Sequence, residues 1–424
     1  MNNDKASNLL KIASYSSASK LLKVISGPIT LLVIGKKLSI EEIGFYFTFF
    51  NLIAMQQLAE LGIGHVIKQS IAHSIYKNEN SFKIKSYFYF SAIWFAGISV
   101  FILIFVGYGG VLFYSSYDGN VEWLYPWWTL VISTSFVTLF LPILLLLEGS
   151  QRQLKLYKSQ AVSSIINPFA ICISLYFNFG LYSISVGLLL SNIALLFLLY
   201  TPFRAILGQI RSYNYKFTFK LTFNELWPLL SKVSIVWGLG FVFWNGFNLI
   251  AFKTLPPTDA GKIIFTFTLA KAGFSISESI TQSHMTLYAA QISQNKIKQT
   301  YLSFLRYRKL AILTLMVGYG LFMALNTIIP GFYIFHKTSP TEITSQIFLF
   351  FITLLLLTTN NNFIRCFKVE PFVYVSTYHS ILCPVVFYFS CLYLSTYLFI
   401  PCTIIILGSI FWSKKISSRF LTSI

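Results

Sequence analysis

The feature that most constrains the fold is a succession of long apolar segments separated by short, mostly basic loops. Twelve such segments can be marked along the 424 residues. A helix needs about 20 residues to cross the hydrocarbon core of a bilayer, and each segment is close to that length. The sequence therefore predicts an all-α membrane protein of about 12 transmembrane helices. The predicted spans are 12–35, 43–66, 86–113, 124–147, 158–178, 181–202, 227–251, 261–286, 309–331, 345–364, 372–391 and 395–413.

Composition supports a membrane protein and disfavours a soluble one. Hydrophobic residues make up 55% of the chain and charged residues only 11%, whereas soluble domains average about 25% charged residues. The loops are too short for a soluble domain, and they contain no P-loop pattern and no metal-ligand spacing. The five cysteines lie in or beside apolar segments and form no C-x-x-C pair. A soluble enzyme, a nucleic-acid-binding protein and a disulfide-rich secreted protein are therefore poor interpretations.

The distribution of Lys and Arg predicts how the spans are oriented. With the N-terminus placed in the cytoplasm, 23 of the 32 Lys and Arg residues fall in inner segments and 5 in outer loops. Positive residues accumulate on the cytoplasmic side, so both termini are expected there. The same bias explains most of the net charge of +19 without an anionic partner. Trp123, Tyr125, Trp127 and Trp128 cluster where the fourth span would meet the outer interface, as an aromatic belt does.

Two turn segments, half a chain apart, resemble each other. Leu38–Gly44 and Leu255–Gly261 each have leucine first, an acidic residue fifth and glycine last. Either the two halves are parallel repeats about an axis along the membrane normal, which is a known transporter plan, or the similarity is chance. The first interpretation predicts two pseudo-symmetric six-helix lobes, 1–203 and 227–424, joined by a cytoplasmic linker at 204–226.

Four lysines fall inside predicted spans: Lys20 and Lys23 in the first, Lys232 in the seventh and Lys271 in the eighth. Such a side chain is costly unless it faces a partner or water. Lys20 and Lys23 share one helix face, so they form either a cationic cavity wall or a pair that snorkels to the cytoplasmic headgroups. Lys232 has the same two interpretations, whereas Lys271 lies near mid-span, too deep for easy snorkelling.

Two carboxylates also fall inside predicted spans. Glu278 lies seven residues after Lys271, within about 20° of it around an ideal helix, so the two form either a polar pathway or a structural ion pair. Glu60, in the second span, lies on the pathway or pairs with a cytoplasmic lysine. The three asparagines at 360–362 are capping groups or a polar gate. With four cations against two anions, the interior favours an anionic substrate over a cationic drug.

Short stretches recur in order along the chain and carry a family resemblance. They are Leu58–Gly64, Leu147-Glu148-Gly149, Trp227-Pro228, Trp237–Gly240, Ala260-Gly261 and Glu370-Pro371-Phe372. A twelve-span chain with these stretches resembles the O-antigen flippases of the Wzx type. These form part of the polysaccharide transporter branch of the multidrug/oligosaccharidyl-lipid/polysaccharide (MOP) exporter superfamily.

The resemblance implies the multidrug-and-toxin-extrusion (MATE) fold and a flippase without a catalytic residue, metal or cofactor. The implied substrate is an oligosaccharide repeat unit on undecaprenyl diphosphate, moved by alternating access across the bacterial inner membrane to the periplasmic leaflet. The four lysines are then expected to contact the diphosphate. The two carboxylates either couple transport to a proton or other ion gradient or balance the lysines. Membrane lipid, the O-antigen polymerase and its chain-length regulator are the implied partners.

Three other functions are left open by the sequence. The same fold would serve an exporter of another lipid-linked envelope precursor or of drugs. A membrane enzyme of polysaccharide assembly would normally need larger outer loops. A purely structural membrane component would leave the lysines inside the spans without a purpose.

Overall fold

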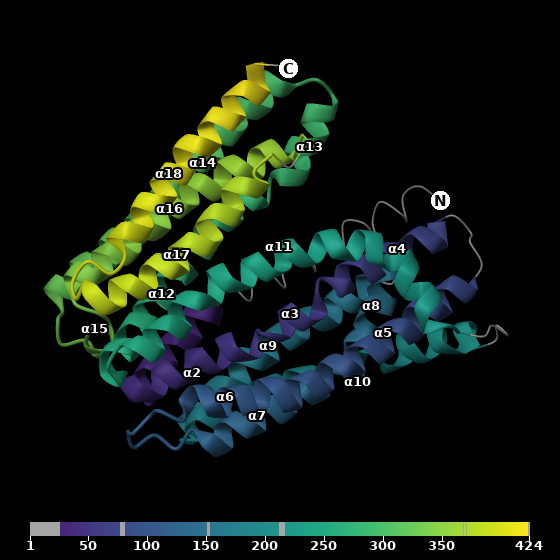
Figure 1. Ribbon diagram of the computed structural model, residues 1–424, viewed down its shortest axis with the longest axis horizontal. Coiled ribbons are helices and arrows are strands. Elements are labelled where there is room, and N and C mark those ends of the chain that lie inside the picture. Colours follow the sequence, from purple (N-terminus) through teal and green to yellow (C-terminus); the bar gives the residue numbers. More distant parts are fainter. Residues whose placement is uncertain are drawn as a thin grey trace. The chain divides into compact units, whose positions relative to one another are not determined.

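The computed structural model describes residues 26–76, 81–150, 153–211, 217–367, 369 and 371–422, and over them it consists of helices joined by turns (Figure 1). Residues 26–37 are helical. The later helices are α2 (Ile40–Ile53), α3 (Gln56–Glu60), α4 (Ile63–Tyr76), α5 (Ser81–Phe101), the π-helical turn η1 (Ile102–Val106), α6 (Gly107–Tyr114), α7 (Leu124–Thr138), α8 (Leu141–Gly149), α9 (Gln153–Tyr176), the 3-10 turn η2 (Gly180–Tyr182), α10 (Ser183–Arg211), α11 (Phe219–Thr254), α12 (Pro257–Gln282), α13 (Met285–Ser293), α14 (Ile297–Ile328), α15 (Tyr333–Lys337), α16 (Thr341–Arg365), α17 (Val373–Tyr393) and α18 (Ile400–Thr422).

Nine helical stretches in the described part of the chain are long and apolar enough to cross a membrane. They coincide with the third to sixth and the eighth to twelfth predicted spans. They are Lys83–Tyr114, Leu124–Gly149, Lys155–Tyr176, Gly180–Gly208, Pro257–Gln282, Ile297–Ile328, Thr341–Arg365, Val373–Tyr393 and Ile400–Phe420. The first predicted span begins outside the described residues, and the seventh lies within the longer helix α11.

The second predicted span is interrupted, which corrects the prediction of one continuous helix over 43–66. Helix α3 ends at Glu60, and α4 begins again at Ile63. Between them Leu61 and Gly62 have φ angles of 52° and 74°, in the left-handed region that stops a helix. The Leu61 amide donates a hydrogen bond back to the Gln57 carbonyl at 3.3 Å.

The helices group into two compact units. Unit 1 comprises Met1–Lys37 and Phe49–Phe241, and unit 2 comprises Leu38–Thr48 and Val242–Ile424. One boundary between the units falls before α2, at Lys37, and the other two fall inside α2 and α11, so each of these helices contributes residues to both units. The predicted division into lobes 1–203 and 227–424 stays a prediction.

Tryptophan and glycine pack closely in unit 1, between α6 and α7. Trp127 is fully buried, its Nε1 donates to the Gly107 carbonyl at 2.9 Å, and its ring occupies the space that a Cβ on Gly110 would need. Trp127 therefore packs inside the protein and does not face the headgroups as the predicted belt would, because Gly110 leaves room for its ring. Tyr125, which is 72% exposed, remains at the surface.

Unit 2 is built around phenylalanine rings from several helices. Phe247 of α11 stacks on Phe267 of α12 at 5.1 Å between ring centroids, and it contacts Phe350 of α16 and Phe387 of α17. These rings are almost fully buried. Since a buried aromatic ring removes a large apolar area from solvent, this cluster holds four helices together.

The two similar turns found in the sequence contact each other in unit 2. Helix α2 begins with a capping box, in which the Ser39 amide donates to Glu42 Oε2 at 2.7 Å and the Glu42 amide donates to Ser39 Oγ at 3.1 Å. One turn later, a Cβ on Gly44 would lie 3.5 Å from the Gly261 Cα, and a Cβ on Gly261 would overlap the Ile40 carbonyl oxygen. Glycine at both positions therefore allows the starts of α2 and α12 to approach closely.

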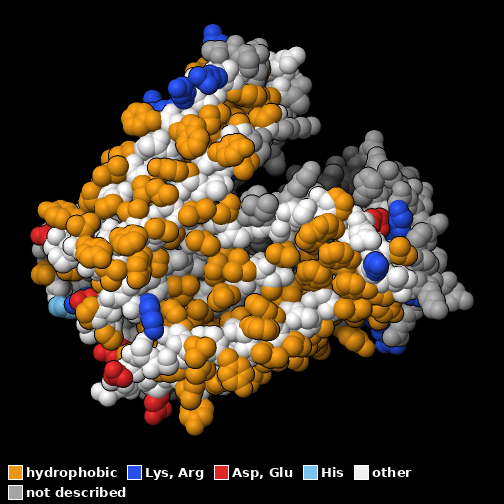
Figure 2. Space-filling view, viewed as in Figure 1, with side chains coloured by type: hydrophobic (Ala, Val, Ile, Leu, Met, Phe, Trp, Pro, Cys, Tyr) orange, Lys and Arg blue, Asp and Glu red, His pale blue; other side chains and the backbone are white. Residues whose placement is uncertain are grey.

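Large apolar side chains lie exposed along the helices, as expected for surfaces that face lipid. Leu112 is 73% exposed and Phe197 is 83% exposed. Figure 2 shows hydrophobic side chains along the visible sides of the helices, with Lys and Arg gathered toward helix ends. A soluble protein rarely exposes so much contiguous apolar surface.

Candidate functional site

The predicted site residues fall in both units. Lys20 and Lys23 lie outside the described residues, and Lys232 belongs to α11 in unit 1, where its side chain is not described. Glu60 ends α3 in unit 1. Lys271 and Glu278 lie on α12 in unit 2, which places these two on one element.

Helix α12 has a buried face and a polar face. It begins with Pro257 at a first-turn position, where proline's missing N–H does no harm. In its second half the buried residues include Ala270, Phe274 and Ser277. Lys271 is half-buried and Ser275 is exposed on the adjoining face, where the Ser275 hydroxyl donates to the Lys271 carbonyl at 2.9 Å.

The Lys271 ammonium contacts Trp244 of α11, a residue that the sequence did not single out. Its Nζ lies 4.9 Å from the centroid of the Trp244 ring and 3.4 Å from the Trp244 carbonyl oxygen. A cation over an indole face is electrostatically favourable. The ammonium has three donors, so this arrangement fixes the charge and leaves donors for a ligand. No sequence signal links the two residues, because they are 27 positions apart.

Glu278 is supported by neutral groups. Its carboxylate interacts with the side chains of Gln282 on α12 and Thr358 on α16. Lys271 lies seven residues away, which is about 10 Å along a helix. Among the described residues, Lys271 and Glu278 form no ion pair with each other. The two side chains therefore occupy separate positions on one polar face.

Glu60 lies where the second span is interrupted. Gln56 Nε2 donates to Glu60 Oε1 at 3.2 Å. The downstream lysine that the sequence predicts at the cytoplasmic face, Lys68, pairs instead with Glu148 of α8 at 3.3 Å. Glu60 therefore presents a half-buried carboxylate at a helix break, a kind of position that transporters use for ion and substrate binding. The glycine at 62 is the sequence signal for this break.

The asparagines at 360–362 make side-chain hydrogen bonds near the end of α16, and their role as capping groups or a polar gate stays a prediction. Asn360 Nδ2 donates to the hydroxyls of Ser413 and Ser417 on α18 at 3.2 and 3.1 Å. Asn361 accepts a very short hydrogen bond from Ser413. Asn362 accepts from Arg365 at 3.0 Å. The hydrogen bonds of Asn360 and Asn361 therefore connect α16 to α18.

Another charged contact in unit 2 holds the start of α2. Lys337 at the end of α15 donates to the Leu38 carbonyl at 2.8 Å. Burial lowers the pKa of Lys337, and the Glu42 carboxylate opposes this by favouring the charged form.

No protein-family model and no curated protein sequence matches the chain. Solved structures do match it over nearly its whole length. A multidrug resistance MATE family transporter of the MOP superfamily, in an inward-facing conformation, has a TM-score of 0.68 and 14% identity, with 96% of this chain and 100% of that chain covered. The chain has the fold of MOP-superfamily transporters. It is therefore an all-helical, multi-span membrane protein.

Two further structures of the MOP fold belong to proteins with different substrates or pockets. The lipid II flippase MurJ, in an inward closed conformation, matches with a TM-score of 0.64 and 16% identity over 94% of this chain and 86% of that one. A MOP superfamily transporter from Pyrococcus furiosus, described as having a binding pocket of reverse polarity, matches with a TM-score of 0.54 and 13% identity over 97% and 96%. At these sequence identities the shared fold does not imply a shared substrate.

Proposed function

We propose that the chain is a flippase for an anionic lipid-linked precursor, and specifically for undecaprenyl-diphosphate-linked O-antigen repeat units. The observation that carries the proposal is the Lys271 ammonium, which is held within a membrane helix by the Trp244 ring and carbonyl. No carboxylate neutralises it among the described residues.

The chemistry of this lysine favours a phosphate ligand. A lysine ammonium is a point charge that binds phosphate without the planar match of arginine. A carrier needs that property, because its substrate must be both bound and released. An organic cation would instead be repelled by an unpaired lysine, and a drug pocket for cations would be expected to present acids.

The fold supports transport of a lipid-linked substrate. A lipid II flippase shares it over most of the chain, so helices arranged in this way are compatible with flipping. In the proposed alternating-access mechanism, one of the lobes 1–203 and 227–424 rocks against the other. The lipid tail stays in the bilayer. The polar headgroup crosses between the lobes.

Six ionisable side chains are assigned roles in this mechanism. Lys20, Lys23 and Lys271 contact the diphosphate, and Lys232 contributes at the cytoplasmic end. Glu60 and Glu278 either couple transport to a proton or other ion gradient or balance the lysine charges. We place the chain in the bacterial inner membrane with both termini in the cytoplasm, working beside the O-antigen polymerase and its chain-length regulator.

The proposal is tested by locating the lipid-linked glycan in cells that lack the chain. Complete repeat units should accumulate on the cytoplasmic leaflet, and the intact gene should restore surface polysaccharide. Lys271→Ala should reduce that restoration at least about tenfold at equal membrane abundance, because a charge-assisted contact is lost. Lys271→Arg should restore part of it.

Lys262→Ala is the matched control, since Lys262 lies on the same helix near its predicted outer end. It should restore polysaccharide fully. Full restoration by Lys271→Ala would contradict the assignment of Lys271. If loss of the protein instead sensitised cells to cationic drugs and left surface polysaccharide intact, a multidrug exporter with the MATE fold would be favoured. Unpolymerised repeat units on the periplasmic leaflet would place the protein after flipping and favour a membrane enzyme of polysaccharide assembly.

A further inference from the structure

A small polar cavity lies in unit 2 between α14, α16 and α18, away from the Lys271 site. Its volume is about 70 Å3. Arg308 of α14, Asn360 of α16, and Ser413 and Lys414 of α18 supply its polar lining, and leucine and isoleucine side chains supply the rest. Among the residues that the structure describes, no carboxylate lines this cavity.

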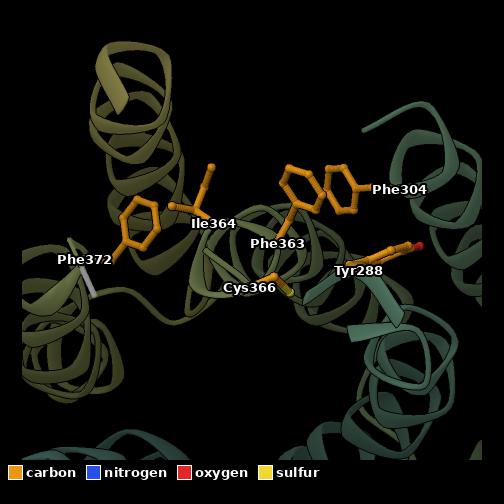
Figure 3. Close-up of a cluster of buried hydrophobic side chains, with 6 residues drawn as sticks. All are labelled: Tyr288, Phe304, Phe363, Ile364, Cys366 and Phe372. Atoms are coloured by element: carbon orange, nitrogen blue, oxygen red, sulfur yellow. The ribbon is translucent and has the colours of Figure 1, made fainter. Parts of the chain in front are cut away.

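Arg308 is held in place by an aromatic ring. Its Cζ lies 5.3 Å from the centroid of Phe304, close enough for a cation–π contact. Phe304 is buried and stacks on Phe363 of α16 at 4.3 Å (Figure 3). Both rings belong to a buried cluster with Tyr288 and Cys366. The guanidinium therefore rests on a fixed apolar surface.

The same arginine has an unused donor. Its Nε is buried and has no hydrogen-bond partner among the described residues. Buried donors are almost always paired, because leaving one unpaired costs free energy, and more so when the group is charged. Arg308 also forms no ion pair with any residue that the structure describes. Arg308 therefore carries a positive charge that no carboxylate in the described residues neutralises.

The remaining polar groups are fixed by contacts with one another. The Asn360 amide donates to Ser413 and Ser417, and Ser413 donates to Asn361. These bonds hold α16 against α18 and set the shape of the cavity. Lys414 is exposed beside it. Two cations therefore line a preformed space, and no carboxylate of the described residues pairs with either of them.

We propose that this cavity binds the phosphate group of an anionic ligand. A space of about 70 Å3 is well above the about 10–15 Å3 that one water needs, which leaves room for a phosphate group. Arginine recognises phosphate through its planar fork of donors, and a nearby lysine adds charge. Arg308 and Lys414 lie near membrane-helix ends that the Lys and Arg distribution places at the cytoplasmic face, where basic pockets between helices bind lipid headgroups. The phosphate has two sources, an anionic phospholipid or soluble phosphate.

The test measures ligand binding by the purified full-length protein in a zwitterionic detergent. Native mass spectrometry and the thermal unfolding midpoint are recorded with phosphatidylglycerol, with phosphatidylcholine and with inorganic phosphate. Phosphatidylglycerol should bind and raise the midpoint more than phosphatidylcholine. Arg308→Gln and Lys414→Gln should each weaken that binding about tenfold. Arg308→Lys should have an affinity between those of the unchanged protein and Arg308→Gln, because it keeps the charge and loses the planar pair of guanidinium donors.

Lys309→Gln and Lys415→Gln are matched controls, since they are exposed neighbours that do not line the cavity. They should leave binding unchanged. Lys414→Gln keeps the test valid if the arginine variants fold poorly, because Lys414 is exposed. Stabilisation by inorganic phosphate alone, lost in the same variants, would support the site with a soluble ligand. Equal weakening by controls and cavity variants, or no binding of either ligand, would overturn the proposal.

Discussion

At the scale of single residues, Lys271 and Trp244 show how a charged side chain is held within an apolar helix bundle. Lys271 stood out because charge is rare in an apolar span. Its partner Trp244 is one of eight tryptophans, and nothing in the sequence distinguishes it. Trp127 shows the same limit, because a tryptophan expected at the interface is buried over Gly107 and Gly110. A side chain's type follows from the sequence, whereas its neighbours follow from packing.

Glycine at position 261 gives a prediction at this scale. Gly261→Ala should destabilise the protein by about 1–3 kcal/mol, the usual cost of overpacking, because its Cβ would overlap the Ile40 carbonyl. Gly44→Ala should cost less, since its Cβ would meet atoms at ordinary contact distance. The thermal unfolding midpoint in detergent measures both effects.

Gly408 provides the comparison. It lies within α18, and a Cβ there would meet nothing within 4 Å. Gly408→Ala should be neutral or stabilising by up to about 1 kcal/mol, because alanine favours the helix. Equal effects of Gly261→Ala and Gly408→Ala would show that the close approach of α2 and α12 is unimportant.

At the scale of elements, the existence of the helices was predictable and their ends were less so. The last hairpin was expected at 372–391 and 395–413, and α17 ends at Tyr393 while α18 begins only at Ile400. Its connecting segment is held by Gln346 of α16, whose Nε2 donates to the Thr396 carbonyl at 2.7 Å and whose Oε1 accepts from the Phe399 amide at 3.2 Å. That side chain comes from another helix, so the local sequence could not reveal where α18 begins.

Replacing this glutamine tests its role. Gln346→Leu should lower the free energy of unfolding by about 2 kcal/mol, because it leaves a buried amide and carbonyl without partners. Chemical or thermal unfolding in detergent measures the change. Ser345→Ala, at the exposed neighbouring position, should be nearly neutral. A similar small effect for Gln346→Leu would mean that water satisfies both backbone groups.

At the scale of the whole molecule, the positive-inside pattern predicts which ends of the helices face the cytoplasm. Asp118, in the exposed turn between α6 and α7, is then outside, and Gln294, in the exposed turn after α13, is inside. Asp118→Cys should react with a membrane-impermeant maleimide in intact cells. Gln294→Cys should react only after permeabilisation. Each is introduced into a chain whose native cysteines are replaced, and that parent chain is the unlabelled control. Labelling of Gln294→Cys in intact cells, with Asp118→Cys labelled only after permeabilisation, would show that the topology is the inverse of the predicted one.

The sequence by itself determined the class of protein, the number and approximate position of most spans, and the presence of lysines in an apolar interior. These features are local, because the bilayer acts as a solvent on each segment separately and requires about 20 apolar residues whatever the neighbours are. Only the tertiary structure decided that Trp244 holds Lys271 and that Gln346 of α16 holds the segment before α18. The boundaries between the two compact units, two of which fall inside α2 and α11, also came from the structure alone. Those features depend on contacts between residues far apart in the chain, and their energies come from packing that no single segment contains.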